Sequence, residues 1–447
     1  MYIAEASGYL HPGGGGCDGA GSLVLHWPTR ERVKVIVGHS AHAAVRLYLT
    51  QTDELVEVPL AALRRGTELL RADELRPRIE LHTEADWALP LVGCCTELWR
   101  MLYRDGQGVE IYVENPLPTG TYGETAVLTA VLEGLGELYE THMSGIALPL
   151  VARRAMQEVA GRPLPLTGLL TTYFGQLGKI LPVRSQQRRT AARIGTPVLR
   201  TDVRAGEVHE AVEPPDDCYL LGVALPDEET IRHNATDLLP TAVSMAYSII
   251  AARQGADRAT LHRARRDGRY GELPYAGFLG TVDYEWMYRD YERLLPETMR
   301  GADFLAQYGQ PIDRFVTVDP NKEYPLRRAG LLPIRQNFDN QRQLDALERV
   351  AAGQLHAEEW TRNWGEGLNT VYRQQLAFDQ VPVRIGQLHD WLTHEALEYR
   401  IYGAVLSRAH RPVLTMLVYG EAAIDRIETR LGEFAEAYGV VPQLLLP

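Results

Sequence analysis

Residues 13–25 of this chain read GGGGCDGAGSLVL, four consecutive glycines followed by Cys17, Asp18 and a short apolar run. A glycine run after a short apolar strand can hold phosphate through its backbone amides, or it can form a simple turn. Strands are expected around it at residues 2–6, 22–25 and 33–38. The run gains meaning as the first of several segments whose order along the chain is informative.

Hydrophobic periodicity predicts the elements that follow. Short strands are expected at residues 46–50 and 111–113, and helices at 86–103, from 124 onward, at 146–159 and at 236–253. Residues 214–217, PPDD, are the best linker candidate. In the last hundred residues we expect a helix containing Leu397 and Ile401, a strand at 413–419, a helix over 424–434 and an edge strand at 440–446. This alternation indicates an α+β layer.

Composition limits the possible functions. The 447 residues allow two domains, and the 45% apolar and 23% charged content is that of a globular protein. The net charge of −12 argues against a nucleic-acid partner or an anionic membrane surface. The four cysteines form no CxxC pair, and no signal peptide or membrane span is evident. We therefore expect a cytoplasmic protein; its oligomeric state stays open.

Several segments resemble, in order and spacing, motifs of the GHMP small-molecule kinases, in the branch of the arabinokinases and galactokinases. Residues 6–25 resemble the family's A-P-G-R-L…G-G…D-Y-S-G-S-L-V-L without a gap. Further matches are residues 28–31, 231–233, 333–338 and 402–404. The resemblance implies an α+β fold of two domains, with a ribosomal-protein-S5-like N-terminal domain at 1–210, a ferredoxin-like C-terminal domain at 211–447, and a cleft between them.

The motifs that hold ATP in this family are altered. The family's phosphate loop, P-x-G-x-G-x-S-S-S-A, leads into a helix whose first amides bind the triphosphate. Here residues 118–126 read PTGTYGETA, so the serine run is absent and Glu124 stands in the first helical turn. A carboxylate at this place suits the helix dipole but repels ATP. The final glycine motif, G-G-G-S-G-G, is replaced at 408–413 by RAHRPV.

The residues that catalyse phosphoryl transfer in the family are also replaced. The resemblance places Gly168 at the position of the catalytic aspartate, Met156 at that of a glutamate and Tyr9 at that of an arginine. Phosphoryl transfer depends on positioning and on electrostatic stabilisation, which these side chains supply. The sequence therefore predicts a chain without an ATP cofactor, and no metal site is expected, including at His39-x-x-His42.

The candidate site residues are those that surround the altered motifs. Asp18 is retained at a position that contacts sugar in the family, although it can equally stabilise a turn. Glu124 is expected to meet Arg408, His410 and Arg411, either as an ion-paired plug or as a new acid–base site in which Glu124, His410 and Asp18 are catalytic. The predicted substrate-binding residues are Asp18, His11, Tyr122, His233, Arg408 and Arg411.

Three functions remain open at this stage. The first is a GHMP-fold enzyme that has lost ATP-dependent phosphotransfer and is repurposed to bind or transform a sugar-like or polyol metabolite, for example in specialised carbohydrate metabolism. The second is a non-catalytic, sugar-sensing pseudokinase. The third is an active sugar 1-kinase, which the absent serine loop disfavours. A small-molecule ligand is the partner in all three.

Overall fold

The computed structural model describes residues 1–12, 18–117, 123–141, 146–185, 207–225, 237–268, 270–378, 380–394, 396, 398–408 and 412–446. Internal contacts divide the chain into two compact units. The first consists of residues 1–9, 28–177 and 445–447, and the second of 10–27 and 178–444. This division differs from the predicted boundary near residue 210, because β8 (Leu181–Arg184) pairs with the start of β2 (Leu23–His39), within the second unit.

The first unit contains a mixed β-sheet. Its strands follow the order β4-β3-β7-β2, and β1 pairs with β2. Strands β3 and β7 run parallel, and the pairs β3–β4 and β2–β7 are antiparallel. The bounds are β1 Tyr2–Leu10, β3 Ala44–Leu49, β4 Glu54–Pro59 and β7 Val109–Glu114. The strands expected at 22–25 and 33–38 are thus parts of the single long strand β2.

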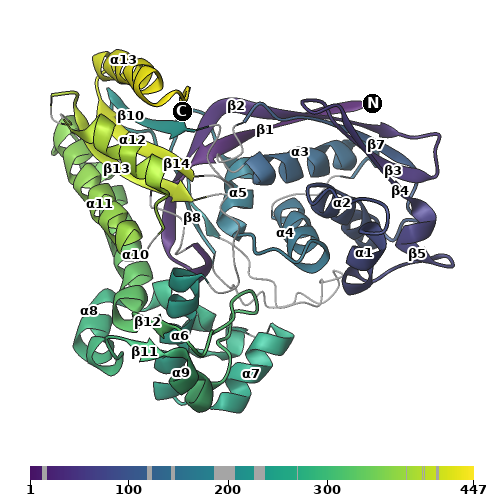
Figure 1. Ribbon diagram of the computed structural model, residues 1–447, viewed down its shortest axis with the longest axis horizontal. Helices are drawn as coiled ribbons and strands as arrows, with labels where there is room; N and C mark the ends of the chain where they lie inside the picture. The colour runs from purple at the N-terminus through teal and green to yellow at the C-terminus, as the bar shows by residue number, and fades with distance from the viewer. Residues whose placement is uncertain are drawn as a thin grey trace. The chain divides into compact units, whose positions relative to one another are not determined.

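Helices complete the hydrophobic core of the first unit. In β2, Val33, Val35 and Val37 alternate with more exposed residues and are fully buried, as the period of a strand requires. Gly134 lets α3 approach this face, since a Cβ there would lie 2.7 Å from Val37 Cγ2. The helices are α1 Ala72–Ile79, α2 Ala88–Met101, α3 Gly123–Leu138, α4 Ala147–Arg154 and α5 Leu166–Phe174 (Figure 1).

One acidic side chain of α3 should make the stability of the protein depend on pH. Withdrawal from water, together with the nearby Glu137, raises the pKa of Glu133 to about 7. The folded protein therefore keeps this proton over a range in which the unfolded chain has released it, so stability falls as pH rises from about 4.5 through about 7. We expect Glu133→Gln to be more stable than the wild type at about pH 8, with the difference shrinking toward about pH 5.

Urea unfolding at the two pH values measures this effect. Glu137→Gln, at an exposed position one turn further along α3, removes only the second of these two causes and should show a smaller pH-dependent difference. Equal curves for Glu133→Gln and the wild type at both pH values would contradict the assignment.

The second unit contains a sheet of order β13-β14-β10-β15, in which β14 runs antiparallel to both of its neighbours. Its strands are β10 Cys218–Ala224, β13 Ile401–Arg408, β14 Pro412–Tyr419 and β15 Gln443–Leu445, the last ending at the unit boundary. Helix α11 (Ala357–Ala377) lies along the edge strand β13 (Figure 1). Its Asn369 and Gln375 side chains both donate to and accept from the β13 backbone, so the helix satisfies part of an otherwise open edge.

The remainder of the second unit is mainly helical. Helices α6 and α10 pack together around a second core that includes Ala246, Ile250 and Leu279. The helices are α6 Leu238–Arg253, α7 Arg258–Asp267, α8 Tyr284–Trp286, α9 Gly301–Tyr308, α10 Leu326–Ala351, α12 Val383–Thr393 and α13 Glu421–Tyr438. Short strands are β5 Arg64–Arg65 and β6 Glu68–Leu69 in the first unit, and β9 Glu207–Val208, β11 Met299–Arg300 and β12 Glu323–Tyr324 in the second.

The prediction of a helix through Ile401 is wrong. Arg400 has a φ of 54°, outside the range of a right-handed helix, and Ile401 opens the buried strand β13. A short apolar run is ambiguous between helix and strand, and its neighbours in the fold decide the outcome. The predicted helix over 424–434 and the strands around it are confirmed as α13, β14 and β15.

Within the described part of the chain, no helix combines the length and the apolar character needed to cross a membrane.

Candidate functional site

Tyr9 and Gly168 meet in the first unit, at the two positions where the resemblance places the family's arginine and catalytic aspartate. Tyr9 lies near the C-terminal end of β1, and Gly168 lies in the first turn of α5. Both are buried. A Cβ on Gly168 would overlap the Tyr9 hydroxyl and would also lie 3.1 Å from Tyr9 Cζ and 3.3 Å from Thr125 Cγ2. The tyrosine ring therefore fills the space that any side chain at position 168 would need.

Met156 and Thr125 are also buried in the first unit. Met156, at the position of the family's glutamate, is fully buried in the hydrophobic core of the first unit. Thr125 in the first turn of α3 is 2% exposed. Burying an ionised carboxylate among apolar groups is costly unless it is paired, so this core favours methionine. Positions 156 and 168, at which the family has acidic residues, therefore carry no carboxylate in this chain.

Glu124 lies in the first turn of α3, where a carboxylate interacts favourably with the helix dipole. Its Oε1 is 2.7 Å from Nη2 of Arg162, and both side chains are about one-third exposed. An exposed pair of this kind adds little to stability. It does place one negative and one positive charge at a helix N-terminus, the place where the family's loop binds phosphate.

A second cluster of polar side chains lies in the other unit, around the segment 10–27. His11 follows β1, Asp18 begins a short helical turn and His26 lies in β2. All three are buried, and the distance from His11 Nε2 to Asp18 Oδ1 is 3.5 Å. The two imidazole rings meet edge to face, with 4.5 Å between their centroids. One potential ligand atom from each residue lies within 4.8 Å of the other two.

Burial controls the protonation of both histidines. Loss of solvation lowers the pKa of His11, although the neighbouring Asp18 partly opposes this effect. The pKa of His26 is lowered well below its ordinary value by burial and then by the charge of His11. Both rings are therefore neutral near pH 7, and each can offer a nitrogen lone pair.

A serine hydroxyl of β13, which is itself in contact with a threonine of β14, holds the backbone at His11. The His11 N–H donates to Ser407 Oγ over 3.3 Å, and that hydroxyl lies 2.8 Å from the His11 carbonyl oxygen, which accepts from it. Ser407 Oγ is also 2.7 Å from Thr415 Oγ1. These buried hydroxyls fix the place where His11 leaves β1, because breaking the contacts would leave buried polar groups unsatisfied.

Helix α10 holds the start of β2, and with it the strand that carries His26. The Leu23 N–H donates to Asn337 Oδ1 over 2.9 Å, and Asn340 Nδ2 donates to the Leu23 carbonyl over 2.8 Å. Ser22 Oγ donates to the Pro333 carbonyl over 2.8 Å. Pro333 and Asn337 belong to the segment 333–338 that matched the kinase motif, so in this chain that motif positions the strand of the cluster.

The other predicted site residues lie wholly or partly outside the described residues. Tyr122, His233, His410 and Arg411 are outside them, and Arg408 is described only as the last backbone position of β13. The expected meeting of Glu124 with Arg408, His410 and Arg411 therefore stays a prediction. Sequence reasoning missed Arg162 and His26 as members of these two places.

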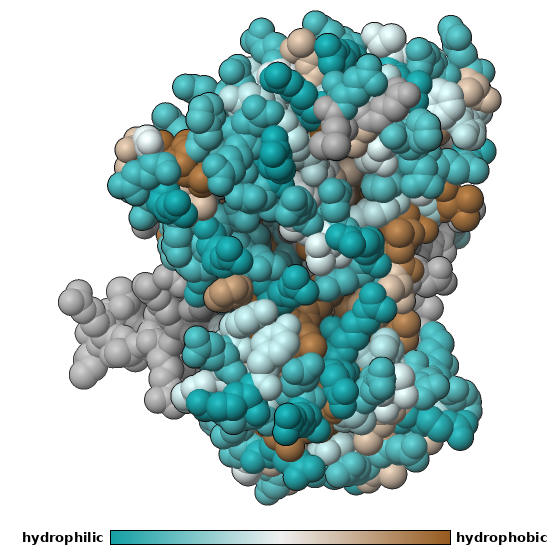
Figure 2. Space-filling model, turned by 90° about the vertical axis from the view of Figure 1, so that its left-hand side faces the viewer, coloured by the Kyte–Doolittle hydropathy of each residue, from teal (hydrophilic) through white to brown (hydrophobic). Residues whose placement is uncertain are grey.

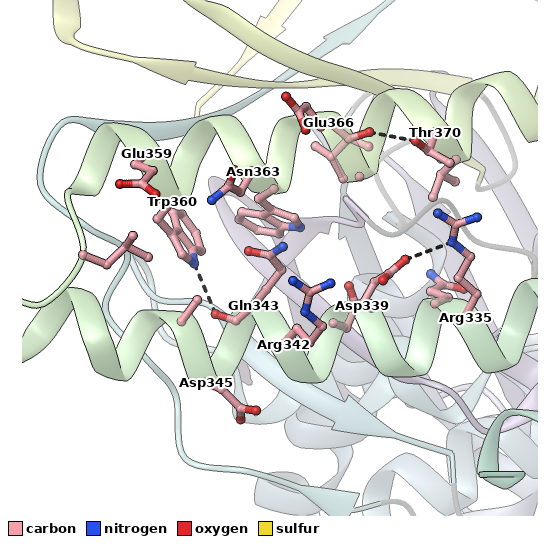
Figure 3. A pocket seen from close by; sticks show the side chains of 18 of the residues that line it. Arg335, Asp339, Arg342, Gln343, Asp345, Glu359, Trp360, Asn363, Glu366 and Thr370 are labelled. Atoms are coloured by element: carbon pink, nitrogen blue, oxygen red, sulfur yellow. Dashed lines mark hydrogen bonds and ion pairs between the residues drawn. The ribbon is translucent and has the colours of Figure 1, made fainter. Parts of the chain in front are cut away.

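A hollow of about 630 Å³ lies between α10 and α11, and none of the predicted site residues lines it. Trp360 and Trp364 are buried at its wall, and Arg335 pairs with Asp339 over 3.5 Å (Figure 3). The face shown in Figure 2 is mostly hydrophilic, with scattered hydrophobic residues. The size is that of a small-molecule site, but the lining combines both charges without a converging set of catalytic groups.

Comparisons with known proteins agree with the fold. No protein-family model matches the chain. It is 22% identical to L-arabinokinase of Arabidopsis thaliana over 373 residues, which is 76% of this chain but only 35% of that protein. The crystal structure of Lactococcus lactis galactokinase complexed with galactose matches all of this chain and 93% of that one, with a TM-score of 0.67 and 12% identity.

Mevalonate kinase of Methanococcus jannaschii also matches over the whole of this chain and 98% of its own, with a TM-score of 0.54 and 8% identity. The chain therefore has a two-domain α+β fold similar to that of these galactokinase and mevalonate kinase structures, and its sequence is similar to that of L-arabinokinase. The prediction made from residues 6–25 and the later motifs is confirmed for the fold and for this similarity.

Proposed function

We propose that this protein binds a sugar-like or polyol metabolite and does not transfer phosphate from ATP, its kinase scaffold having been repurposed for a different reaction on that ligand. The observation that supports this most strongly is the contact between Tyr9 and Gly168. Where the family has an arginine and an aspartate, this chain has a buried phenol and no side chain. The site then lacks the carboxylate that orients the accepting hydroxyl in a phosphoryl transfer.

Two further observations support the same proposal. Met156 occupies another acidic position of the family within an apolar core. Glu124 in the first turn of α3 forms an ion pair with Arg162, so a side-chain carboxylate occupies the helix N-terminus at which the family's loop would receive phosphate. Asp18, by contrast, retains the carboxylate that the family uses toward sugar hydroxyls, and the galactokinase with a similar fold was crystallised with galactose.

A thermal-shift screen with hexoses, pentoses, polyols and sugar phosphates tests the ligand class. A ligand at 100 times its dissociation constant should stabilise the protein by about 2.7 kcal/mol. We expect at least one sugar-like compound to raise the melting temperature in protein freed of metal by chelation, and Asp18→Asn to abolish the shift. Asp425→Asn, on the exposed face of α13, is the matched control and should respond as the wild type does.

A screen in which no sugar, polyol or sugar phosphate shifts the wild-type melting temperature would contradict the proposed ligand class. Once a ligand is found, its incubation with the protein followed by mass spectrometry separates two outcomes. A changed mass or a new isomer identifies an enzyme, and unchanged ligand identifies a sensor.

A further inference from the structure

The buried cluster of His11, Asp18 and His26 has the composition of a metal site. Two imidazoles and one carboxylate form a common three-ligand set for divalent first-row metals and leave at least one coordination position open. No other group of three or more potential ligands is found among the described residues. The two histidines are 15 positions apart on different elements, so their meeting is a property of the fold and not of local spacing.

We propose that His11, Asp18 and His26 bind one divalent first-row transition metal ion, of which Zn²⁺ is the best match. This inference does not rest on the proposed function.

The distances fit this site after a small adjustment. Metal–ligand bonds of about 2.1 Å require ligand atoms separated by about 3 to 4 Å in tetrahedral or octahedral geometry. The 3.5 Å between His11 Nε2 and Asp18 Oδ1 lies within this range, and the largest separation in the cluster is under 4.8 Å. A small rotation of an imidazole ring would bring the wider separations into this range.

The chemistry of the three side chains selects the class of metal. Neutral imidazoles bind Zn²⁺, Co²⁺ and similar ions, whereas Mg²⁺ and Ca²⁺ prefer sets made of oxygen alone. The carboxylate of Asp18 offsets part of the ion's charge inside the protein.

The backbone around the cluster is held from several directions, as a metal site requires. Ser407 and Thr415 fix the chain at His11, and pairing with Leu181 in β8 fixes the backbone of His26. Because these contacts already fix the backbone at His11 and His26, binding of the ion costs little conformational entropy there.

The test is metal binding by the full chain without an affinity tag. Protein stripped with a chelator is incubated with Zn²⁺, desalted, and its metal content is measured by plasma mass spectrometry. We expect about one Zn²⁺ per chain and a raised melting temperature, and we expect Co²⁺ to give visible ligand-field absorption. An equal concentration of Mg²⁺ should neither bind nor compete.

Three variants locate the ion. His11→Asn, Asp18→Asn and His26→Gln should each lower the affinity for Zn²⁺ by at least about tenfold. The double variant His39→Gln/His42→Gln is the matched control, since these two exposed histidines have ligand-like spacing but lie elsewhere, and it should bind as the wild type does. Circular dichroism verifies that each variant is folded.

Two results would overturn the proposal. One is a wild-type protein that retains less than about one-tenth of an equivalent of Zn²⁺, which needs no variant to interpret. The other is stoichiometric binding that persists in folded His11→Asn and His26→Gln proteins, or that is lost in the His39→Gln/His42→Gln control.

Discussion

Replacing Gly168 with aspartate is expected to destabilise the protein by about 3 kcal/mol or more and to leave it without kinase activity. The new side chain would have to enter the space that Tyr9 already fills. The Thr125 side chain also lies close to this space. Overpacking of this kind forces neighbouring groups off their rotamers, and a buried carboxylate adds a desolvation cost. Chemical denaturation measures the loss.

A double-mutant cycle identifies Tyr9 as the cause. In the background Tyr9→Ala, the cost of Gly168→Asp should fall by at least about 1 kcal/mol, because residues in contact are not additive. Gly432→Asp is the matched control, since Gly432 is an exposed residue of α13 with no atom within 4 Å of a Cβ placed there. A Gly168→Asp protein as stable as the wild type would show that the tyrosine can leave this space easily.

Replacing Gly403 with alanine is expected to destabilise the protein by about 3 kcal/mol. Gly403 is part of the Y-G-A segment in β13, and a Cβ there would lie 2.5 Å from the Cα of Gly365 in α11. The two backbones cross in direct contact, and backbone atoms cannot move aside as a flexible side chain can. The shift of the thermal unfolding midpoint measures the effect.

Gly367→Ala, two residues after Gly365 in α11, is the control, and its expected effect on stability has the opposite sign. A Cβ at this position meets nothing within 4 Å, so alanine should stabilise the helix by about 0.5–1 kcal/mol. If the two alanine variants have the same stability, the close approach of α11 and β13 is not a feature of the folded protein.

The strongly periodic and motif-bearing parts of the fold could be predicted from the sequence. The spacing of Val131, Leu135 and Leu138 predicts α3, and the structure has it at Gly123–Leu138. The motif at residues 333–338 predicts the family, although its contacts to Leu23 could not be foreseen. The strand at Ile401 was missed because apolar residues that are buried on both faces show neither period.

The candidate sites were less accessible to sequence reasoning, because they depend on which distant residues touch. The sequence presents Tyr9 and Gly168 as two separate replacements, whereas their contact makes them one coupled change in packing. His26 gave no signal of its own, since a single histidine in an apolar strand is usually structural. Its proximity to His11 and Asp18 arises only when β1 and β2 are placed side by side.

The most direct test of the central claim is an assay of phosphoryl transfer with the wild-type protein. The protein is incubated with ATP, Mg²⁺ and a panel of sugars and polyols, and ADP formation is followed by a coupled reaction beside an active galactokinase. We predict that no sugar raises ADP formation above the rate without protein. Sugar-dependent ADP formation that scales with protein concentration, and is lost in Asp18→Asn, would contradict the account and identify an active sugar kinase.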